Sequence, residues 1–213
     1  MRVNCGKSGR GKSEGMTVQA RPHLIALSDP SRAPDPFLLA RALPPGAWLI
    51  WRAYGQAPSR DEVTRLTRLV HARKGQLLIA GTGQLAGHMA RLSDGIHLPA
   101  HRLKGAYTEQ FRQRPRARFQ ITAAAHGERD IIAAARAGVD VVLISPVFAT
   151  ASHPGVCPLG VTRFAYLATR ARALGLGVCA LGGVTDKTRM RRLKGSRPAG
   201  FAGIGFFNPQ TQA

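Results

Sequence analysis

Hydroxyl and imidazole side chains gather in one short segment of the chain, residues 150–153. Thr150, Ser152 and His153 lie within four residues and directly follow the apolar run 139–148. Such groups can hold an anion by hydrogen bonding, and His153 can add a positive charge. Because loops that follow strands often carry function, we predict that this segment belongs to a binding site.

Two glycine-containing turns indicate a phosphate-binding site. Gly182 and Gly183 end one apolar run, and the segment 203–208 ends another with Phe207 and Asn208. Glycine lets the backbone N–H groups of a turn approach an anion closely. The same glycines also suit ordinary turns between strands and helices, so the pattern alone leaves both interpretations open.

His126 and Arg52 are two further candidates. His126 follows the apolar run 118–125, and an imidazole can accept and donate a proton near neutral pH, so it is a candidate acid–base group. Arg52 lies near the end of the apolar run 47–53, where a guanidinium needs an anionic partner. That partner is either a substrate phosphate or a carboxylate of the chain itself.

The elements that must position these residues alternate regularly from residue 22 onwards. Apolar runs predict strands at 23–28, 47–53, 76–81, 95–99, 118–125, 139–148, 177–183 and 200–207. Helical spacing of apolar residues predicts helices at 35–43, 59–74, 82–91, 127–137, 160–174 and 185–194. Ser59 and Glu62 form a capping-box pattern at the start of the second helix.

Eight strands with helices between them predict an α/β fold, a (β/α)8 TIM barrel over residues 22–213, with its active site after the strand ends. An open doubly wound sheet would need a glycine-rich dinucleotide turn where Ser28-Asp29-Pro30-Ser31 stands. A last helix is missing, because only a short tail follows Phe207. The apolar strip that this exposes favours a homodimer.

Carboxylates are scarce, with only 11 Asp and Glu residues. Several open predicted helices, where they suit the helix dipole, and Asp94 precedes a strand, which places it at the opposite end of the barrel. Asp29 alone clearly follows a predicted strand. A Mg²⁺ site normally uses one or two carboxylates. We therefore predict no metal site and no cofactor.

Composition excludes several classes of protein. No apolar run approaches the roughly 20 residues that span a membrane. The net charge is +20, but the basic clusters lack interleaved aromatic residues, so we expect no nucleic-acid partner. Three cysteines without metal spacing suit a cytoplasmic protein. Residues 1–21 have no hydrophobic period and predict a disordered basic extension, with Met16 as an alternative start.

The segments that hold these candidates resemble the thiamine phosphate synthase / thiazole tautomerase superfamily, a set of (β/α)8 barrels of thiamine biosynthesis. The resemblance covers about residues 23–208. It is strongest in Ala125-His126, Gly138-Val139-Asp140, residues 145–152, Leu159-Gly160, residues 180–184 and the strand around Gly203. The stretch Gly95-Ile96-His97-Leu98 is also similar to the family's fourth strand.

In this superfamily the synthase couples hydroxymethylpyrimidine diphosphate to thiazole phosphate, using Mg²⁺ and releasing pyrophosphate. The tautomerase moves a proton within thiazole phosphate and has no metal site. The resemblance implies that His126 is the catalytic proton shuttle and that Arg52 and His153 lie at the diphosphate position. It implies a substrate phosphate bound by Thr150, Ser152, Gly182, Gly183, Phe207 and Asn208.

The diphosphate and metal half of the family pattern is largely replaced. Of the strand-two Gln-x-Arg-x-Lys motif only Arg52 is kept, with Ile50 and Tyr54 at the other two positions. The family's metal carboxylates fall near Ala80-Gly81 and near Arg102. We therefore favour a tautomerase-like or divergent member that binds thiazole phosphate without a metal.

Two alternatives stay open. The chain is a thiamine phosphate synthase, a transferase that uses Mg²⁺, if Arg102 and His153 replace the missing lysines and metal ligands. It is a non-catalytic sensor of a phosphate ligand if neither chemistry survives.

Overall fold

The computed structural model describes residues 22–53, 58–81, 89, 91–103, 118–150 and 155–204. The predicted disordered extension over 1–21 and the alternative start at Met16 lie outside these residues. The C-terminal tail, on which the missing helix and the dimer strip depend, also lies outside them.

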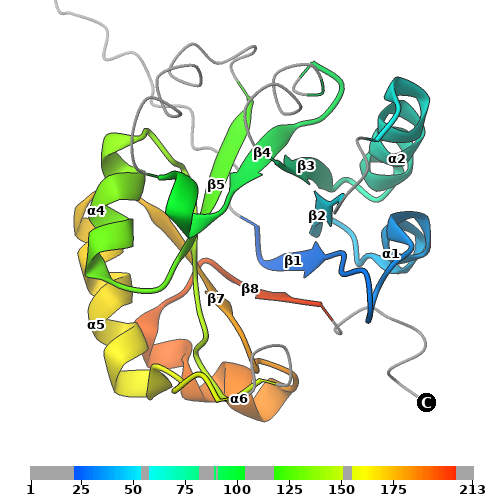
Figure 1. Cartoon of the computed structure of the whole chain (residues 1–213). Helices are drawn as coiled ribbons and strands as arrows, with labels where there is room; N and C mark the ends of the chain where they lie inside the picture. The colour runs from blue at the N-terminus through cyan, green and yellow to red at the C-terminus, as the bar shows by residue number, and fades with distance from the viewer. Residues whose placement is uncertain are drawn as a thin grey trace, which may run out of the picture.

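Eight parallel strands form one closed barrel in which each strand pairs with its neighbours in the sequence and β8 pairs with β1 (Figure 1). This confirms the predicted (β/α)8 barrel. The strands are β1 Leu24–Leu27, β2 Trp48–Arg52, β3 Gln76–Ala80, β4 Gly95–Leu98, β5 Gln120–Ala125, β6 Val141–Ile144, β7 Gly177–Leu181 and β8 Gly200–Gly203.

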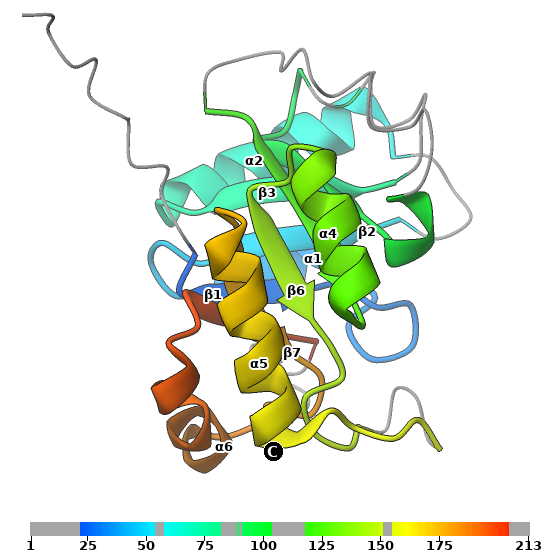
Figure 2. The ribbon, with the colours of Figure 1, turned by 90° about the vertical axis from the view of Figure 1, so that its left-hand side faces the viewer.

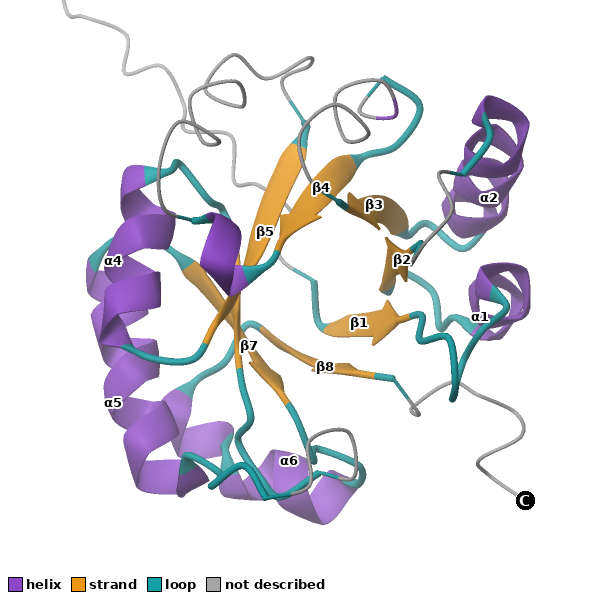
Figure 3. Ribbon diagram, in the orientation of Figure 1, coloured by secondary structure: helices purple, strands orange, loops and turns teal. Residues whose placement is uncertain are grey.

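The helices lie outside the strands (Figure 3). They are α1 Pro36–Ala42, α2 Arg60–Ala72, α4 Glu128–Arg136, α5 Gly160–Ala173 and α6 Lys187–Arg192, with 3₁₀ turns η1 Ala100–Arg102 and η3 Lys194–Ser196. Helices α4 and α5 lie next to each other over β6 (Figure 2). Most of the helix predicted at 82–91 falls outside the described residues.

Local sequence explains how α2 begins and which face it buries. The Ser59 hydroxyl accepts from the Glu62 amide at 3.2 Å, and the Glu62 carboxylate accepts from the Ser59 amide at 2.8 Å, so the predicted capping box is present. Such a cap contributes about 1 kcal/mol. Val63, Leu66 and Val70 recur at helical spacing and are fully buried against the barrel. The cap and the apolar stripe together hold α2 against the strands.

The predicted strand over 139–148 proves shorter, because β6 ends at Ile144. Ser145 still pairs with β5, its amide donating to the Ala125 carbonyl at 3.0 Å, but Pro146 has no N–H with which to continue the ladder. Residues 145–149 instead form a loop beside the end of β7. This correction matters for function, since the loop belongs to the candidate site.

The barrel interior is apolar over most of its length and polar near the strand ends. Its buried apolar residues come from β1, β2, β3, β6, β7 and β8: Ile25, Leu27, Trp48, Ile50, Leu78, Val141, Leu143, Cys179 and Ala202. Arg52, Ala80, His97 and Thr122 are register partners across β2–β5. Since Ala80 packs against the interior cluster, this row of residues faces inward.

The opposite end of the barrel contains Asp94, as predicted. Its carboxylate accepts from the Leu77 amide at 2.9 Å and contacts the His71 ring at 2.8 Å. Asp94 therefore accepts a hydrogen bond at the start of β3, and it lies away from the strand ends that carry the candidate site residues.

Candidate functional site

His126 lies immediately after β5, and two hydrogen bonds set its orientation. Its amide donates to the Asp130 carboxylate at 2.8 Å, and its ring Nδ1 lies 2.9 Å from the Ser145 carbonyl oxygen. A carbonyl can only accept, so Nδ1 carries the proton and the neutral ring keeps a lone pair on Nε2. The side chain is exposed, so the imidazole is available as a base. The contacts with Asp130 and Ser145 could not be predicted from the sequence pattern.

The loops after β6 and β7 are joined by backbone hydrogen bonds beyond the ends of these strands. The Val147 amide donates to the Leu181 carbonyl at 2.9 Å, and the Phe148 amide donates to the Gly182 carbonyl at 3.0 Å. The Ser145–Pro146 peptide is cis. The loop that includes Ser145, which orients His126, is therefore also bonded to the glycine turn.

The Gly182–Gly183 turn requires glycine at both positions. Their φ values are +88° and +66°, a region that other residues rarely adopt. A Cβ on Gly182 would lie 2.7 Å from the Pro146 Cα, and one on Gly183 would lie 2.4 Å from the Ala149 carbonyl oxygen. The turn is thus pressed against the loop after β6, closer than any side chain would permit.

Both carbonyls of this turn point toward donors of the protein. The Gly182 carbonyl accepts from the Phe148 amide, and the Gly183 carbonyl accepts from Arg189 Nη1 at 2.6 Å. In a trans peptide the C=O and N–H bonds point in opposite directions, so the Gly183 and Val184 N–H groups face away from these donors. Neither N–H group has a partner among the residues that the structure describes. Adjacent backbone N–H groups of this kind are able to donate to an anion, so the predicted role of the turn in phosphate binding is compatible with its geometry.

Of the remaining predicted phosphate ligands, only Thr150 lies among the described residues. Thr150 is half-buried at the end of the described segment 118–150. Ser152, His153, Phe207 and Asn208 lie outside the described residues, so their predicted roles stay predictions.

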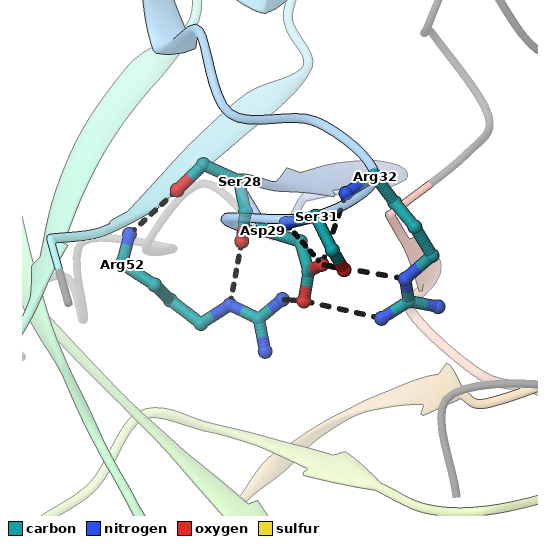
Figure 4. Close-up of polar contacts among 5 residues, drawn as sticks. All are labelled: Ser28, Asp29, Ser31, Arg32 and Arg52. Carbon is teal, nitrogen blue, oxygen red and sulfur yellow. Dashed lines mark hydrogen bonds and ion pairs between the residues drawn. The ribbon is translucent and has the colours of Figure 1, made fainter.

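Arg52 is held at the end of β2 by β1 and the loop after it (Figure 4). Its Nε donates to the Ser28 carbonyl at 2.7 Å, its backbone amide donates to the Ser28 hydroxyl at 2.8 Å, and its Nη2 lies 3.1 Å from Asp29 Oδ2. Of the two partners considered for Arg52, the carboxylate of the chain is present. A substrate anion at this position would therefore meet a guanidinium that is already bonded.

The same carboxylate also binds Arg32, from the side opposite Arg52 (Figure 4). Arg32 Nη2 lies 3.1 Å from Asp29 Oδ2, and the Ser31 hydroxyl donates to Oδ1 at 2.8 Å. Burial acts to raise the pKa of Asp29, but the hydrogen bonds from Arg32 and Ser31 outweigh it and hold this pKa well below its usual range. Asp29 is therefore charged at any ordinary pH, and it neutralises one of the two arginines.

His97 is a buried histidine in the barrel interior, in register with Ala80 of β3 and so close to Arg52. Its Nδ1 lies 2.9 Å from the Thr122 hydroxyl. Burial, with a smaller contribution from the positive charge of Arg52, lowers the pKa of His97 to about 3. The ring is thus neutral in the folded protein, and it is a polar interior residue to which the sequence had assigned no role.

The described residues at the ends of β3 and β4 do not provide ligands for a magnesium ion. Ala80 and Gly81 stand at the end of β3, and Pro99 to Arg102 follow β4, so neither strand end offers a carboxylate. Within the described ranges, no group of three or more His, Cys, Asp or Glu side chains could hold a metal. Arg102 is half-buried in η1, on the same side of the barrel. None of the described helices is long and apolar enough to cross a membrane.

Comparison with known proteins points in one direction. The family model described as thiamine monophosphate synthase matches residues 24–204. A protein of Aquifex aeolicus, named "Putative thiamine-phosphate synthase 2", is 28% identical over 87% of this chain and 97% of its own length. The solved thiamine phosphate pyrophosphorylase of Pyrococcus furiosus shares the fold, with a TM-score of 0.68, 17% identity, and 90% and 91% of the two chains covered.

A barrel from another enzyme matches this chain with a lower TM-score and a lower identity. The deoxyribose phosphate aldolase of Aeropyrum pernix has a TM-score of 0.57 and 15% identity, with 87% of this chain and 86% of the aldolase covered. At such identities the solved structures speak for the fold alone, and the family assignment depends on the match over residues 24–204.

Proposed function

The chain belongs to the thiamine monophosphate synthase family, and we propose that it binds a thiazole phosphate and moves a proton within it, as a tautomerase-like enzyme of thiamine biosynthesis. Such an enzyme needs an anchor for the phosphate and one group that carries the proton. It does not need the charge stabilisation that a diphosphate leaving group demands.

The contact between His126 Nδ1 and the Ser145 carbonyl, at 2.9 Å, carries this proposal. It leaves Nε2 as the basic atom of an exposed ring directly after a barrel strand. In the proposed reaction Nε2 takes a proton from one position of the ligand, and the resulting imidazolium returns a proton to another. The ligand gains and loses one proton, so its composition and electron count are unchanged.

The proposed phosphate anchor is the turn after β7. The N–H groups of Gly183 and Val184 would donate to phosphate oxygens, because their own peptide carbonyls are already bonded on the other side. The turn is joined to the loop of Ser145, which holds His126, so the anchor and the base belong to one hydrogen-bonded unit. Both groups required by the proposed reaction thus come from the ends of β5 and β7, which flank β6 in the barrel.

Thiamine phosphate synthase is the second candidate function, because the names of the Aquifex and Pyrococcus proteins refer to it. That reaction must stabilise a pyrophosphate leaving group with metal ions or free cations. Arg52 shares its guanidinium with Asp29 and Ser28, and the residues after β3 and β4 do not suit Mg²⁺. These observations favour the tautomerase-like reading over the synthase.

One experiment separates the two. The purified protein is incubated with hydroxymethylpyrimidine diphosphate, thiazole phosphate and Mg²⁺, with and without a chelator, and thiamine phosphate is measured. Conversion of the thiazole phosphate tautomer is followed in parallel without metal. We expect tautomer conversion that is indifferent to the chelator. Thiamine phosphate production that the chelator abolishes would establish the synthase instead, and binding without either turnover would indicate a sensor.

We also propose a cytoplasmic location. Cys157 and Cys179 are both free, as expected in a reducing compartment. Burial raises the pKa of Cys179 to about 12, so this interior thiol stays protonated and unreactive.

A further inference from the structure

We infer that Arg189 is a positioning residue that holds the Gly182–Gly183 turn in its anion-binding form and so gives the site its preference for a phosphate-bearing ligand. The inference depends on the proposed function for the identity of the ligand, but not for the existence of an anion site. Arg189 lies in the basic segment 187–197, and its sequence context alone indicates no function for it.

The contacts of Arg189 converge on the turn from α6. Nη1 donates to the Gly183 carbonyl at 2.6 Å and to the Thr185 hydroxyl at 3.0 Å. Asp186 holds the arginine in place: its Oδ1 accepts from the Arg189 amide at 2.8 Å, and its Oδ2 lies 3.7 Å from Nε. A surface arginine without these contacts would sample many rotamers, so the network selects the one that reaches the turn.

Phe148 supports the same arginine from the loop after β6. The Arg189 guanidinium lies 5.7 Å from the centre of the Phe148 ring, and that of Arg192 lies 5.2 Å from it. A cation over an aromatic face is attracted to it. The Phe148 amide meanwhile donates to the Gly182 carbonyl. One residue therefore binds the first peptide of the turn directly and supports the arginine that binds the second.

The consequence for ligand binding follows from the geometry of the peptide bond. If the Gly183 carbonyl loses its donor, the peptide between Gly183 and Val184 can rotate, and the Val184 N–H then no longer points away from α6. The hydrogen bond from a cation also polarises this peptide, which makes its N–H a better donor. Arg189 thus acts on the anion through the backbone and need not touch the anion itself.

The chain offers a close control. Arg192 lies against the same Phe148 ring, but no hydrogen bond joins it to the glycine turn in the described part of the chain. Substituting either arginine by alanine removes one positive charge and one contact with the ring, whereas only Arg189→Ala removes the donor to Gly183. A second variant, Arg189→Lys, keeps the charge but not the forked guanidinium that reaches both Gly183 and Thr185.

The test measures the dissociation constants of thiazole phosphate, of the corresponding thiazole alcohol and of inorganic phosphate, by titration calorimetry. Wild type, Arg189→Ala, Arg189→Lys and Arg192→Ala are compared after thermal unfolding confirms that each is folded. We expect Arg189→Ala to weaken thiazole phosphate and inorganic phosphate by about tenfold, the scale of one charge-assisted hydrogen bond, and to leave the alcohol unchanged. Arg192→Ala should weaken them by less than about threefold.

Each outcome decides something. Equal losses in Arg189→Ala and Arg192→Ala would reduce Arg189 to a general contribution of charge and overturn the inference. Equal losses for the phosphate and the alcohol would show a merely structural role. If wild type binds inorganic phosphate with the expected dependence on Arg189 but does not prefer thiazole phosphate, the inference stands and the proposed function fails. If wild type binds neither anion, both fail.

Discussion

The loops after β1 and β2 and the loops after β6 and β7 differ in whether their polar groups are bonded to one another. After β1 and β2, Asp29 is saturated by Ser31, Arg32 and Arg52, so the charges there bind one another. After β6 and β7, the protein binds the carbonyls of a glycine turn and leaves the opposite N–H groups free among the described residues. A side that is internally satisfied suits a structural role, whereas a side with oriented donors and a held imidazole suits a ligand.

The largest effect should come from removing the base. His126→Gln keeps a polar side chain of similar size but cannot carry a proton, so we expect tautomer conversion to fall by about 100- to 10,000-fold with little change in thiazole phosphate affinity. Steady-state kinetics would check this. His71→Gln, at the opposite end of the barrel, is the matched control and should retain full activity. An active His126→Gln enzyme would remove His126 from its proposed role.

The glycine turn should be the next most sensitive point. Gly183→Ala forces an L-residue to φ +66° and sets its Cβ against the Ala149 carbonyl, so we expect a loss of about 2–4 kcal/mol in the free energy of unfolding and loss of phosphate binding. Gly138→Ala has a similar φ of +70° but open space around the added Cβ, and should cost only about 1–2 kcal/mol. Urea unfolding of the two variants compares them, and equal costs would mean that the loop after β6 yields to the added methyl group.

Asp29→Asn should free the arginine charges at the ends of β1 and β2. This change leaves two arginines without their shared charge, so we expect a loss of about 1–3 kcal/mol in the free energy of unfolding and tighter binding of inorganic pyrophosphate. Glu128→Gln, at an exposed pair with Arg170, should have a much smaller effect on the free energy of unfolding, because solvent screens this pair.

The pH dependence of Asp29→Asn follows from the lowered pKa of Asp29. A carboxyl whose pKa is depressed in the folded state stabilises the protein above its unfolded pKa, and this contribution is lost as the pH falls through the folded one. The difference between wild type and Asp29→Asn should therefore be constant from pH 7 to 5 and shrink only in strong acid. Unfolding measured at several pH values checks this, and a difference that disappears by pH 5 would contradict the network.

The last effect appears only below neutral pH and concerns His97, which lies inside the barrel near Arg52. Because its pKa falls to about 3 in the folded state, the unfolded chain binds the proton first as the pH drops below about 6.5. Wild type should lose up to about 1.4 kcal/mol per pH unit between pH 6 and 4 relative to His97→Gln. Parallel slopes for the two proteins would show that the His97 ring is charged or solvated in the fold.

Sequence patterns predicted the barrel well, but they did not predict the contacts that surround the candidate site residues. Apolar runs placed all eight strands, since buried parallel strands are continuously apolar, and Ser59 with Glu62 marked a helix start that the structure confirms. Interactions between distant residues could not be predicted. Arg52 could meet a substrate or a carboxylate, and only the closure of β1 against β2 brings Asp29, 23 residues away, to it.

Arg189 was missed for a related reason. Within a basic cluster each cation looks like part of a solvated surface, and nothing in composition distinguishes one of them. A signal did exist: Arg189 stands six residues after Gly183, in the first turn of the short helix that follows the glycine pair. An arginine at that spacing after a glycine turn is a candidate donor to the carbonyls of the turn.

The hydrogen bonds between the loops after β6 and β7 also bear on ligand length. Ser145 orients the His126 imidazole, and the amides of Val147 and Phe148 on the same loop bond to the Leu181 and Gly182 carbonyls, so this loop sets the separation between the imidazole and the glycine turn. Under the proposed function, a ligand must match that separation. A thiazole whose side chain is one methylene longer could place either its phosphate or its ring correctly, but not both. Thiazole phosphates with a longer alkyl chain should therefore bind nearly as well as the proposed ligand but be converted much more slowly, which measured affinity and kcat would show.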